Sequence, residues 1–209
     1  KNVSVFNRVR DYVINSFGAT TSLTNIQSGL ERQGVRIKRE TLNRYLQILG
    51  DAKIISKARF DMKSRKSLQG EQKYYLADLS FYFALSTDNR INYGPVLENI
   101  VYSYARSLGY EVGVGRIGKL ECDFVMRSPE TGYAYVQVAM TIMSDRKTED
   151  REYRPLEQIR DNWPKFVITR NDPIQHRGGI VHENVTELIG EGRTFGLVQK
   201  DVWTDGERR

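Results

Sequence analysis

Residues 113–126 read G-V-G-R-I-G-K-L-E-C-D-F-V-M, and the first seven of them fit the G-x-x-x-x-G-K opening of a phosphate-binding P-loop. A P-loop continues with Ser or Thr and then with a helix, whereas Leu120 follows the lysine here. From Leu120 onward the side chains alternate, with Leu120, Cys122, Phe124 and Met126 on one face, which is the period of a β-strand. The stretch therefore predicts two strands joined by the glycine turn G-R-I-G-K, and no ATP site.

The rest of the second half shows further periodic segments. A helix is predicted to begin at about Pro95. After the hairpin, we expect a strand over residues 133–140, a charged helix over 145–162 and a strand over 164–169. Residues 170–179 read as a loop. This order of elements predicts a mixed sheet flanked by helices.

The first half of the chain predicts three helices followed by a strand pair. The helices are expected over residues 3–17, 22–33 and 38–50. Strand-like runs at 53–60 and 73–77 then flank a long basic loop. Three helices and a basic hairpin are the order of a winged-helix domain, whose third helix enters the major groove of DNA while the hairpin touches the backbone.

Charge divides the chain into two parts, and we place two domains at residues 1–80 and 81–209. Residues 1–80 carry 15 Lys and Arg against 7 Asp and Glu, a net charge of +8. Residues 81–209 carry 17 against 19, a net charge of −2, which leaves the whole chain at +6. A basic half joined to a nearly neutral half predicts that the first half binds a polyanion, DNA above all. A basic surface that only keeps the protein soluble is the alternative.

Basic and amide side chains on the third helix and on the hairpin are the candidate DNA contacts. On the helix they are Lys38, Arg39, Asn43 and Arg44, and on the hairpin they are Lys57, Arg59, Lys63, Arg65, Lys66 and Lys73. We expect the hairpin cations to hold phosphates. Winged helices also dock proteins, so a protein platform for an acidic partner and a spacer with a solvated basic face are the alternatives.

The order of elements in the second half is that of the PD-(D/E)xK nuclease core: a helix with Glu, a strand with Asp, a strand with an acid-x-Lys motif, then a helix and a strand. The segments K-Y-Y-L-A-D-L-S-F-Y-F-A-L (73–85), G-P-V-L-E-N-I-V-Y-S-Y-A-R-S-L-G-Y-E-V (94–112), K-L-E-C-D-F-V-M (119–126), Y-A-Y-V-Q-V-A-M (133–140) and R-E-Y-R-P-L-E-Q-I-R-D-N-W-P-K-F-V-I-T (151–169) add a further likeness. With them the chain resembles the C-terminal region of unknown function that follows the ATPase module in a large family of prokaryotic AAA-type ATPases.

The resemblance implies an α/β (α+β) chain, in which an N-terminal winged helix leads into a PD-(D/E)xK nuclease-like mixed sheet flanked by helices. It also implies that an N-terminal ATPase module is the partner of this region in a longer parent chain. The absence of a P-loop agrees with that expectation.

By position, the resemblance assigns Glu98 as the helix acid, Asp123 as the metal-binding acid, and Gln137 with Ala139 as the third motif. Nucleases of this kind hold a divalent cation through carboxylates and use a lysine to handle the attacking water. Gln137 is neutral and Ala139 has no ammonium, so we expect a vestigial site without catalysis, metal or other cofactor. The alternative is a DNA endonuclease that uses Mg²⁺ with Glu98, Asp123, Gln137 and a relocated lysine. The candidates for that lysine are Lys119, Lys147 and Lys165.

Each of these residues also has a purely structural interpretation. Asp123 on an apolar strand would pair with an arginine such as Arg116, because an unpaired buried carboxylate is unfavourable. Glu98 would be an exposed residue near a helix start. His176 and His182 lie six residues apart in a Gly-containing loop and lack placed acids for a metal site.

Cysteine and apolar content bear on the compartment. The one cysteine, Cys122, excludes a disulfide framework and a cysteine-based zinc site. No apolar run approaches the roughly 18 residues of a membrane span, and the first residues lack the apolar middle of a signal peptide. We therefore expect a cytoplasmic protein that makes no membrane contact, and a sequence without an initial Met is expected to be a piece of a longer chain.

Overall fold

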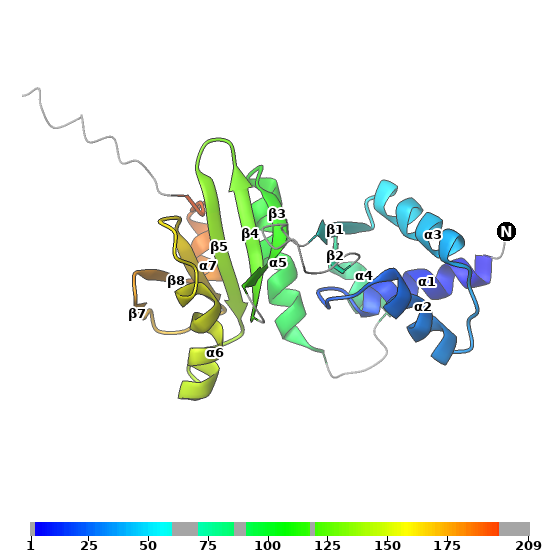
Figure 1. Ribbon diagram of the computed structural model, residues 1–209, viewed down its shortest axis with the longest axis horizontal. Helices are drawn as coiled ribbons and strands as arrows, with labels where there is room; N and C mark the ends of the chain where they lie inside the picture. The colour runs from blue at the N-terminus through cyan, green and yellow to red at the C-terminus, as the bar shows by residue number, and fades with distance from the viewer. Residues whose placement is uncertain (1–2, 60–70, 86–90, 118–119, 197–209) are drawn as a thin grey trace, which may run out of the picture.

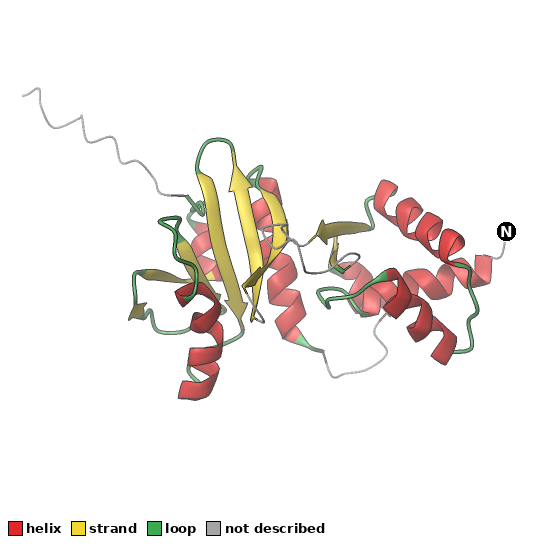
Figure 2. Ribbon diagram, viewed as in Figure 1, coloured by secondary structure: helices red, strands yellow, loops and turns green. Residues whose placement is uncertain are grey.

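The computed structural model describes residues 3–59, 71–85, 91–117 and 120–196, and these residues form a mixed α/β fold with a six-stranded mixed sheet (Figure 1). The predicted α/β (α+β) class is therefore confirmed. We call the described residues up to 85 the N-terminal unit and those from 91 onward the C-terminal unit. The two lie side by side along the long axis of the molecule, with helices dominating the first and the sheet dominating the second (Figure 2).

Three helices begin the N-terminal unit: α1 (Val3–Asn15), α2 (Leu23–Arg32) and α3 (Arg39–Asp51). The side chain of Ser22 accepts a hydrogen bond from the Asn25 amide at 3.1 Å and so caps α2. The apolar faces of the three helices meet in one core cluster, which includes Val9, Leu30 and Leu42. The three predicted helices are confirmed, with ends that differ by one or two residues.

A strand pair follows the helices. β1 (Ile55–Arg59) and β2 (Gln72–Leu76) are antiparallel, with Ile55 opposite Leu76 and Arg59 opposite Gln72. The loop between them carries Lys63, Arg65 and Lys66, which lie outside the described residues. Figure 1 shows the pair between the helices and the six-stranded sheet.

Two helices continue the chain toward the sheet: α4 (Ser80–Leu85), which the sequence did not predict, and α5 (Tyr93–Ser107). α5 begins two residues before the predicted Pro95, because the side chain of Asn92 accepts from the Gly94 amide at 3.2 Å. Hydrophobic residues of α4 and Val96 of α5 pack on the helical core cluster. The apolar cluster of the N-terminal unit thus extends past residue 80, where we predicted the domain boundary.

The six-stranded sheet has the order β3-β4-β5-β6-β8-β7. The outer hairpins are antiparallel, while β5 with β6 and β6 with β8 are parallel pairs. The strands are β3 (Glu111–Ile117), β4 (Leu120–Ser128), β5 (Gly132–Ala139), β6 (Lys165–Thr169), β7 (His176–Arg177) and β8 (Ile180–Asn184).

Helices cover both faces of the sheet. α5 and α7 (Val185–Gly190) share one core cluster with β-strand residues such as Phe124 and Ile168. α6 (Arg146–Glu157) packs on the opposite face through Tyr153 and Leu156. This arrangement is the mixed sheet flanked by helices that the sequence predicts. In the described residues, no helix combines the length and apolar character that a membrane crossing requires.

Three expectations are corrected. The loop over residues 170–179 contains β7, and the sequence did not predict β8 and α7. The helix predicted over 145–162 ends at Glu157, two residues after the internal Pro155. Gly115 lies inside β3, not in a turn, and a Cβ there would lie 2.7 Å from the Val125 side chain. This glycine serves the close approach of β3 to β4.

Candidate functional site: an acidic pocket beside a buried lysine

A bulge in β4 sets the direction of Asp123. Between two register pairs, one residue of β3, Val114, faces two residues of β4, Asp123 and Phe124. Phe124 belongs to the core cluster under α5, whereas Cys122 belongs to the cluster under α6. The predicted alternation, with Cys122 and Phe124 on one face, is therefore wrong here, because the extra residue resets the period of the strand. Bulges of this kind re-aim a side chain next to a site.

The side chain of Asp123 continues the hydrogen bonding between β4 and β5 beyond the last backbone pair of these two strands. The register runs up to Phe124 opposite Val136. Beyond it, Asp123 Oδ2 accepts from the Val138 amide at 2.9 Å, and the Asp123 amide donates to Gln137 Oε1 at 3.4 Å. Asp123 thus has a structural role, because it satisfies a backbone donor that the diverging strands leave without a ladder partner.

Lys73 of β2 brings an ammonium group from the N-terminal unit into this region. Its Nζ lies 2.9 Å from Glu98 Oε1, 2.7 Å from Glu121 Oε1 and 3.8 Å from Asp123 Oδ1. Only 4% of the lysine side chain is exposed. We call these four residues the Lys73 cluster. Burial alone would lower the pKa of Lys73, but the charges of Glu98, Asp123 and Glu121 raise it above its usual value.

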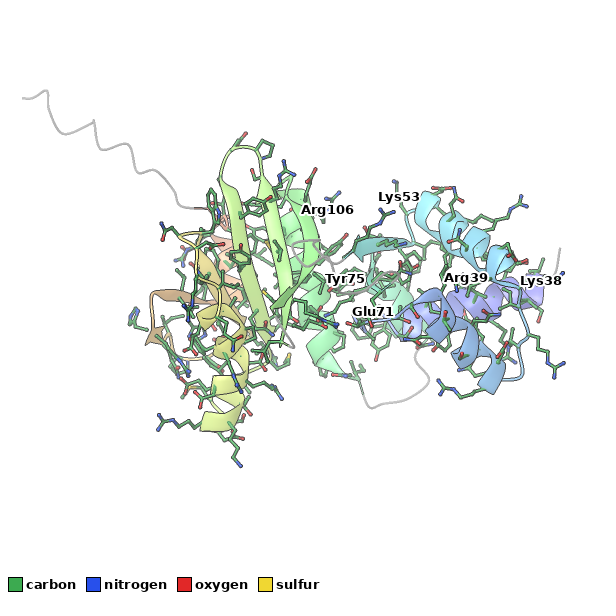
Figure 3. All side chains as sticks on the ribbon, viewed as in Figure 1. Lys38, Arg39, Lys53, Glu71, Tyr75 and Arg106 are labelled. Carbon is green, nitrogen blue, oxygen red and sulfur yellow. The ribbon has the colours of Figure 1, made fainter. Side chains whose placement is uncertain are left out.

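α5 supplies the counterpart of β2 in the contact between the two units. The Tyr75 hydroxyl donates to Glu98 Oε1, and the Tyr75 ring stacks on Tyr102 with centroids 4.2 Å apart. The buried Asn99 accepts from the Leu76 amide at 2.7 Å and donates to the Leu76 carbonyl at 3.0 Å. Figure 3 shows Tyr75 where the two units meet. Glu98, Tyr102 and Asn99 of α5 therefore contact β2 through an ion pair, ring stacking and hydrogen bonds, respectively.

Gln137 of β5 is tied to α6. Its amide group donates to Glu152 Oε2 at 3.0 Å, and the other oxygen of Glu152 lies 2.6 Å from the guanidinium of Arg151. Glu152 is buried, with 6% of its surface exposed. Both ends of the Gln137 side chain are thus occupied by protein groups, since its oxygen accepts from Asp123.

These groups surround an open pocket of about 410 Å³. The lining comes from the start of α5, the first half of β4, the end of β5 and one face of α6, including Glu98, Glu121, Asp123, Gln137 and Glu152. The residues do not fit a divalent cation as they are arranged. Lys73 already supplies the positive charge among three carboxylates. In addition, one carboxylate oxygen of Asp123 and the amide oxygen of Gln137 accept hydrogen bonds from backbone amides.

Burial and the negative charges around the pocket shift the pKa of Asp123. Burial, and then the charge of Glu98, raises the pKa of Asp123 well above its usual range, although Lys73 acts in the opposite direction. Burial and the charge of Glu98 also raise the pKa of the Tyr75 hydroxyl. Within the Lys73 cluster, one ammonium therefore does not offset three full negative charges.

The structure corrects several of the predicted roles. Lys73 is buried in the cluster and does not lie on a basic surface, so its assignment as a phosphate contact is wrong. Glu98 is largely buried, with 14% of its side chain exposed, and is not the exposed residue of the structural interpretation. Arg116, the expected partner of Asp123, lies 3.4 Å from Glu71 and 3.9 Å from Glu121.

Two of the proposed replacement lysines are placed away from the pocket. Lys147 is exposed on α6, and Lys165 donates to the carbonyl oxygens of Asp161 and Trp163 at 2.7 and 3.1 Å. Neither lines the pocket. Lys119 lies outside the described residues.

The two histidines are separated in the fold, because His176 is exposed on β7 and His182 is buried on β8. His182 Nδ1 accepts from the Gln175 amide at 3.0 Å, and Nε2 lies 2.8 Å from the Thr169 hydroxyl. The ring thus holds a loop against β6. This contact pattern is structural.

The remaining candidate DNA contacts are on the surface of the N-terminal unit. Lys38, Arg39, Asn43 and Arg44 of α3 and the residues before it are exposed, as are Lys57 and Arg59 of β1. Figure 3 shows Lys38 and Arg39 in the part of the N-terminal unit that is remote from the sheet. The basic surface and the acidic pocket are therefore separate regions of the molecule.

Sequence reasoning missed two residues that line the pocket, Glu121 and Glu152, and it missed Lys73 as the buried cation beside it. A signal for Glu121 was present, since it lies two residues before Asp123 and shares its strand face by alternation. For Lys73 no such signal exists. Its role depends on the packing of β2 against α5, which no local pattern encodes.

Comparisons with known proteins do not assign a family. No family model matches the sequence, and no solved structure matches it. An uncharacterized protein of Haemophilus influenzae is 28% identical over 170 residues, which cover 81% of this chain and 41% of that protein. The chain thus spans about two fifths of the length of the curated relative that it matches.

Proposed function

We propose that this chain is a non-catalytic, DNA-binding part of a larger protein, in which the N-terminal unit is a winged helix and the C-terminal unit is a degenerate nuclease-like domain. Following the resemblance described above, an AAA-type ATPase module is its partner in the parent chain. The proposed compartment is the cytoplasm, where the lone Cys122 remains reduced.

The charge distribution along the chain is the observation that carries the DNA-binding proposal. In the part of the chain that the structure describes, Lys38, Arg39, Arg44, Lys57 and Arg59 have no carboxylate at ion-pair distance. In the C-terminal unit some cations are paired, as Arg177 is with Glu149 and Glu157, and others, such as Lys147, are not paired within the described residues. Residues 81–209 nevertheless carry a net charge of −2, against +8 for residues 1–80. Exposed cations on α3 and on the adjacent strand β1, within a half of the chain that has a net positive charge, fit a polyanion.

The acidic pocket supports the non-catalytic half of the proposal. Three of its four carboxylates lie within 4 Å of the Lys73 ammonium, and its third motif provides Gln137 and Ala139 in place of an acid and a lysine. The Lys73 cluster joins β2 of the N-terminal unit to α5 and β4 of the C-terminal unit.

Salt-dependent binding to duplex DNA tests the proposal. Each phosphate contact contributes about −0.9 to the slope of log affinity against log salt. The triple variant Lys38→Ala, Arg44→Ala, Lys57→Ala is expected to weaken binding and to reduce the slope by roughly 2 to 3. The charge-matched control, Lys147→Ala, Arg154→Ala, Arg160→Ala, alters exposed cations of the C-terminal unit and should leave the slope unchanged. Equal effects of both triple variants would contradict the proposed surface.

A DNA endonuclease with a relocated lysine is a second candidate, and one observation favours it. Lys73 delivers an ammonium to the acids Glu98 and Asp123, which the nuclease resemblance assigns as the site. We expect no cleavage of single- or double-stranded DNA in Mg²⁺ or Mn²⁺. Cleavage that is lost in both Lys73→Met and Asp123→Asn would establish this candidate in place of the first. Duplex binding absent at every salt concentration would instead favour the protein platform.

A further inference from the structure

A polar groove runs between α3 and β1. It has a volume of about 280 Å³, and its lining includes Asn43, Gln47 and Asp51 of α3 together with Lys57 of β1. Asn43 and Gln47 are exposed and lie one helical turn apart on the same side of α3. One wall of the groove therefore presents two amide side chains, and the other presents a cation.

The cation in this groove is poorly compensated. Although Asp51 lines the same groove, no ion pair joins it to Lys57 in the described structure. Partial burial, and then the charge of Arg59, lowers the pKa of Lys57. An anion seated beside Lys57 would relieve both effects, and a backbone phosphate is such an anion.

The exposed side chains of α3 are not those expected of a helix that only contacts phosphates. Besides the cations Arg39 and Arg44, it carries the amides Asn43 and Gln47 and the exposed Ile48, which has 43% of its surface accessible. Glu40, in the first turn of the helix, is also exposed. An acid there repels phosphates and weakens binding that depends on charge alone.

Amide and apolar side chains are better suited to contact base edges than to contact phosphates. Asn and Gln donate and accept together, which suits the adjacent donor and acceptor of adenine in the major groove. An apolar side chain such as Ile48 suits the methyl group of thymine. Residues four apart on a helix are separated by about 6 Å along its axis, or about two base-pair steps.

We infer that α3 reads base edges, with Asn43 and Gln47 as the residues that determine specificity for A·T pairs and Lys57 as a phosphate contact that positions the helix. This inference rests on the proposed DNA binding and adds sequence selectivity to it. The chain should prefer duplexes with A·T pairs within a span of two or three base pairs.

Selection from a random-sequence duplex library with the full chain tests the inference. We expect enrichment of a short A·T-containing site. The affinity ratio between the enriched duplex and a scrambled one should fall by about tenfold in Asn43→Ala and in Gln47→Ala, with an unchanged salt slope. Lys57→Ala should reduce the slope by about 0.9 and preserve the ratio. Asn162→Ala, an exposed amide of the C-terminal unit, is the matched control.

Three outcomes would overturn the inference, and they differ in what else they remove. Duplex binding without any enriched sequence would refute base reading and leave the proposed DNA binding intact. An enriched sequence whose affinity ratio is unchanged in Asn43→Ala and Gln47→Ala would move the reading residues elsewhere. Absence of duplex binding at low salt would refute both this inference and the proposed function.

Discussion

Lys73 Nζ of the N-terminal unit lies 2.9 Å from Glu98 Oε1 of the C-terminal unit, and both side chains are largely buried. The ammonium also lies 2.7 Å from Glu121 Oε1, so a single cation serves two carboxylates directly and Asp123 at a longer distance. Charges withdrawn from water in this way must be satisfied by one another. The contact therefore joins the two units, since their separation would leave buried charges unpaired.

Loss of the Lys73 ammonium should strongly destabilise the protein. Lys73→Met leaves Glu98, Glu121 and Asp123 close together without their cation, and removing one partner of a buried pair costs about 3–5 kcal/mol. Urea unfolding at pH 7 measures the change in the free energy of unfolding. The control Lys147→Met, at an exposed position of α6, should stay within about 0.5 kcal/mol of the parent.

A second change tests whether charge is the cause. Adding Glu98→Gln to Lys73→Met removes one of the unpaired carboxylates, so the double variant should be more stable than Lys73→Met alone. If Lys73→Met is as stable as the parent, or if adding Glu98→Gln lowers the free energy of unfolding further, the Lys73 cluster does not hold the units together as described.

Asp123→Asn should be at least as stable as the parent at pH 7. Burial and the charge of Glu98 raise the pKa of Asp123 above its unfolded-state value of about 3.9, so between these two pKa values the folded state binds more protons than the unfolded state. The stability that this group contributes is present below about pH 4 and is lost as the pH rises through the folded-state pKa. The advantage of the asparagine variant should therefore grow from about pH 4 upward.

Urea unfolding across that pH range measures the advantage. Asp145→Asn is the matched control, because Asp145 is exposed and asparagine also serves as an N-cap for α6. A stability deficit above 1 kcal/mol for Asp123→Asn at pH 7 would show that the carboxylate is needed in its charged form.

Acid should release the loop that His182 holds. Nδ1 accepts from the Gln175 amide, so the neutral ring carries its proton on Nε2 and donates to Thr169, whose hydroxyl donates to Asn184. Burial lowers the pKa of His182, while the charge of Asp172 opposes this effect. The stability contributed by this group is present above the unfolded-state pKa of about 6.5 and is lost as the pH falls through the folded-state value.

Hydrogen exchange at the Gln175 amide is the measurement for this prediction. Its protection, corrected for intrinsic exchange, should decrease below about pH 6. The response should persist in His176→Gln, which alters the exposed histidine, and should be absent in His182→Asn. Unchanged protection of the parent between pH 7 and pH 5 would contradict the assigned role of the ring.

Cys122 should not react with thiol reagents in the folded protein. Its side chain is fully buried beneath α6, and burial raises its pKa to about 12, so the reactive thiolate is both shielded and scarce. Alkylation followed by mass spectrometry should show no label under native conditions and one label per chain in urea. Rapid labelling of the native protein would show that β4 opens locally.

The elements with local signals were predicted from the sequence. The helix predicted over residues 22–33 forms as α2 with Ser22 as its cap, and the alternation after Leu120 predicted a strand where a P-loop motif suggested a helix. The short elements β7, β8 and α7 lacked such signals and were missed. Among the site residues, Glu98, Asp123 and Gln137 do meet at one pocket.

Periodicity and capping depend on neighbours in the chain, which is why the sequence by itself determined the class of fold, most of its helices and the strand character of residues 120–128. The bulge at Asp123 and Phe124 and the position of Lys73 were decided only by the tertiary structure. Lys73 is 25 residues from Glu98 and 50 from Asp123 in sequence. Whether these charges face solvent or one another depends on the packing of β2 against α5, because a buried charge is tolerated only where another element supplies its partner.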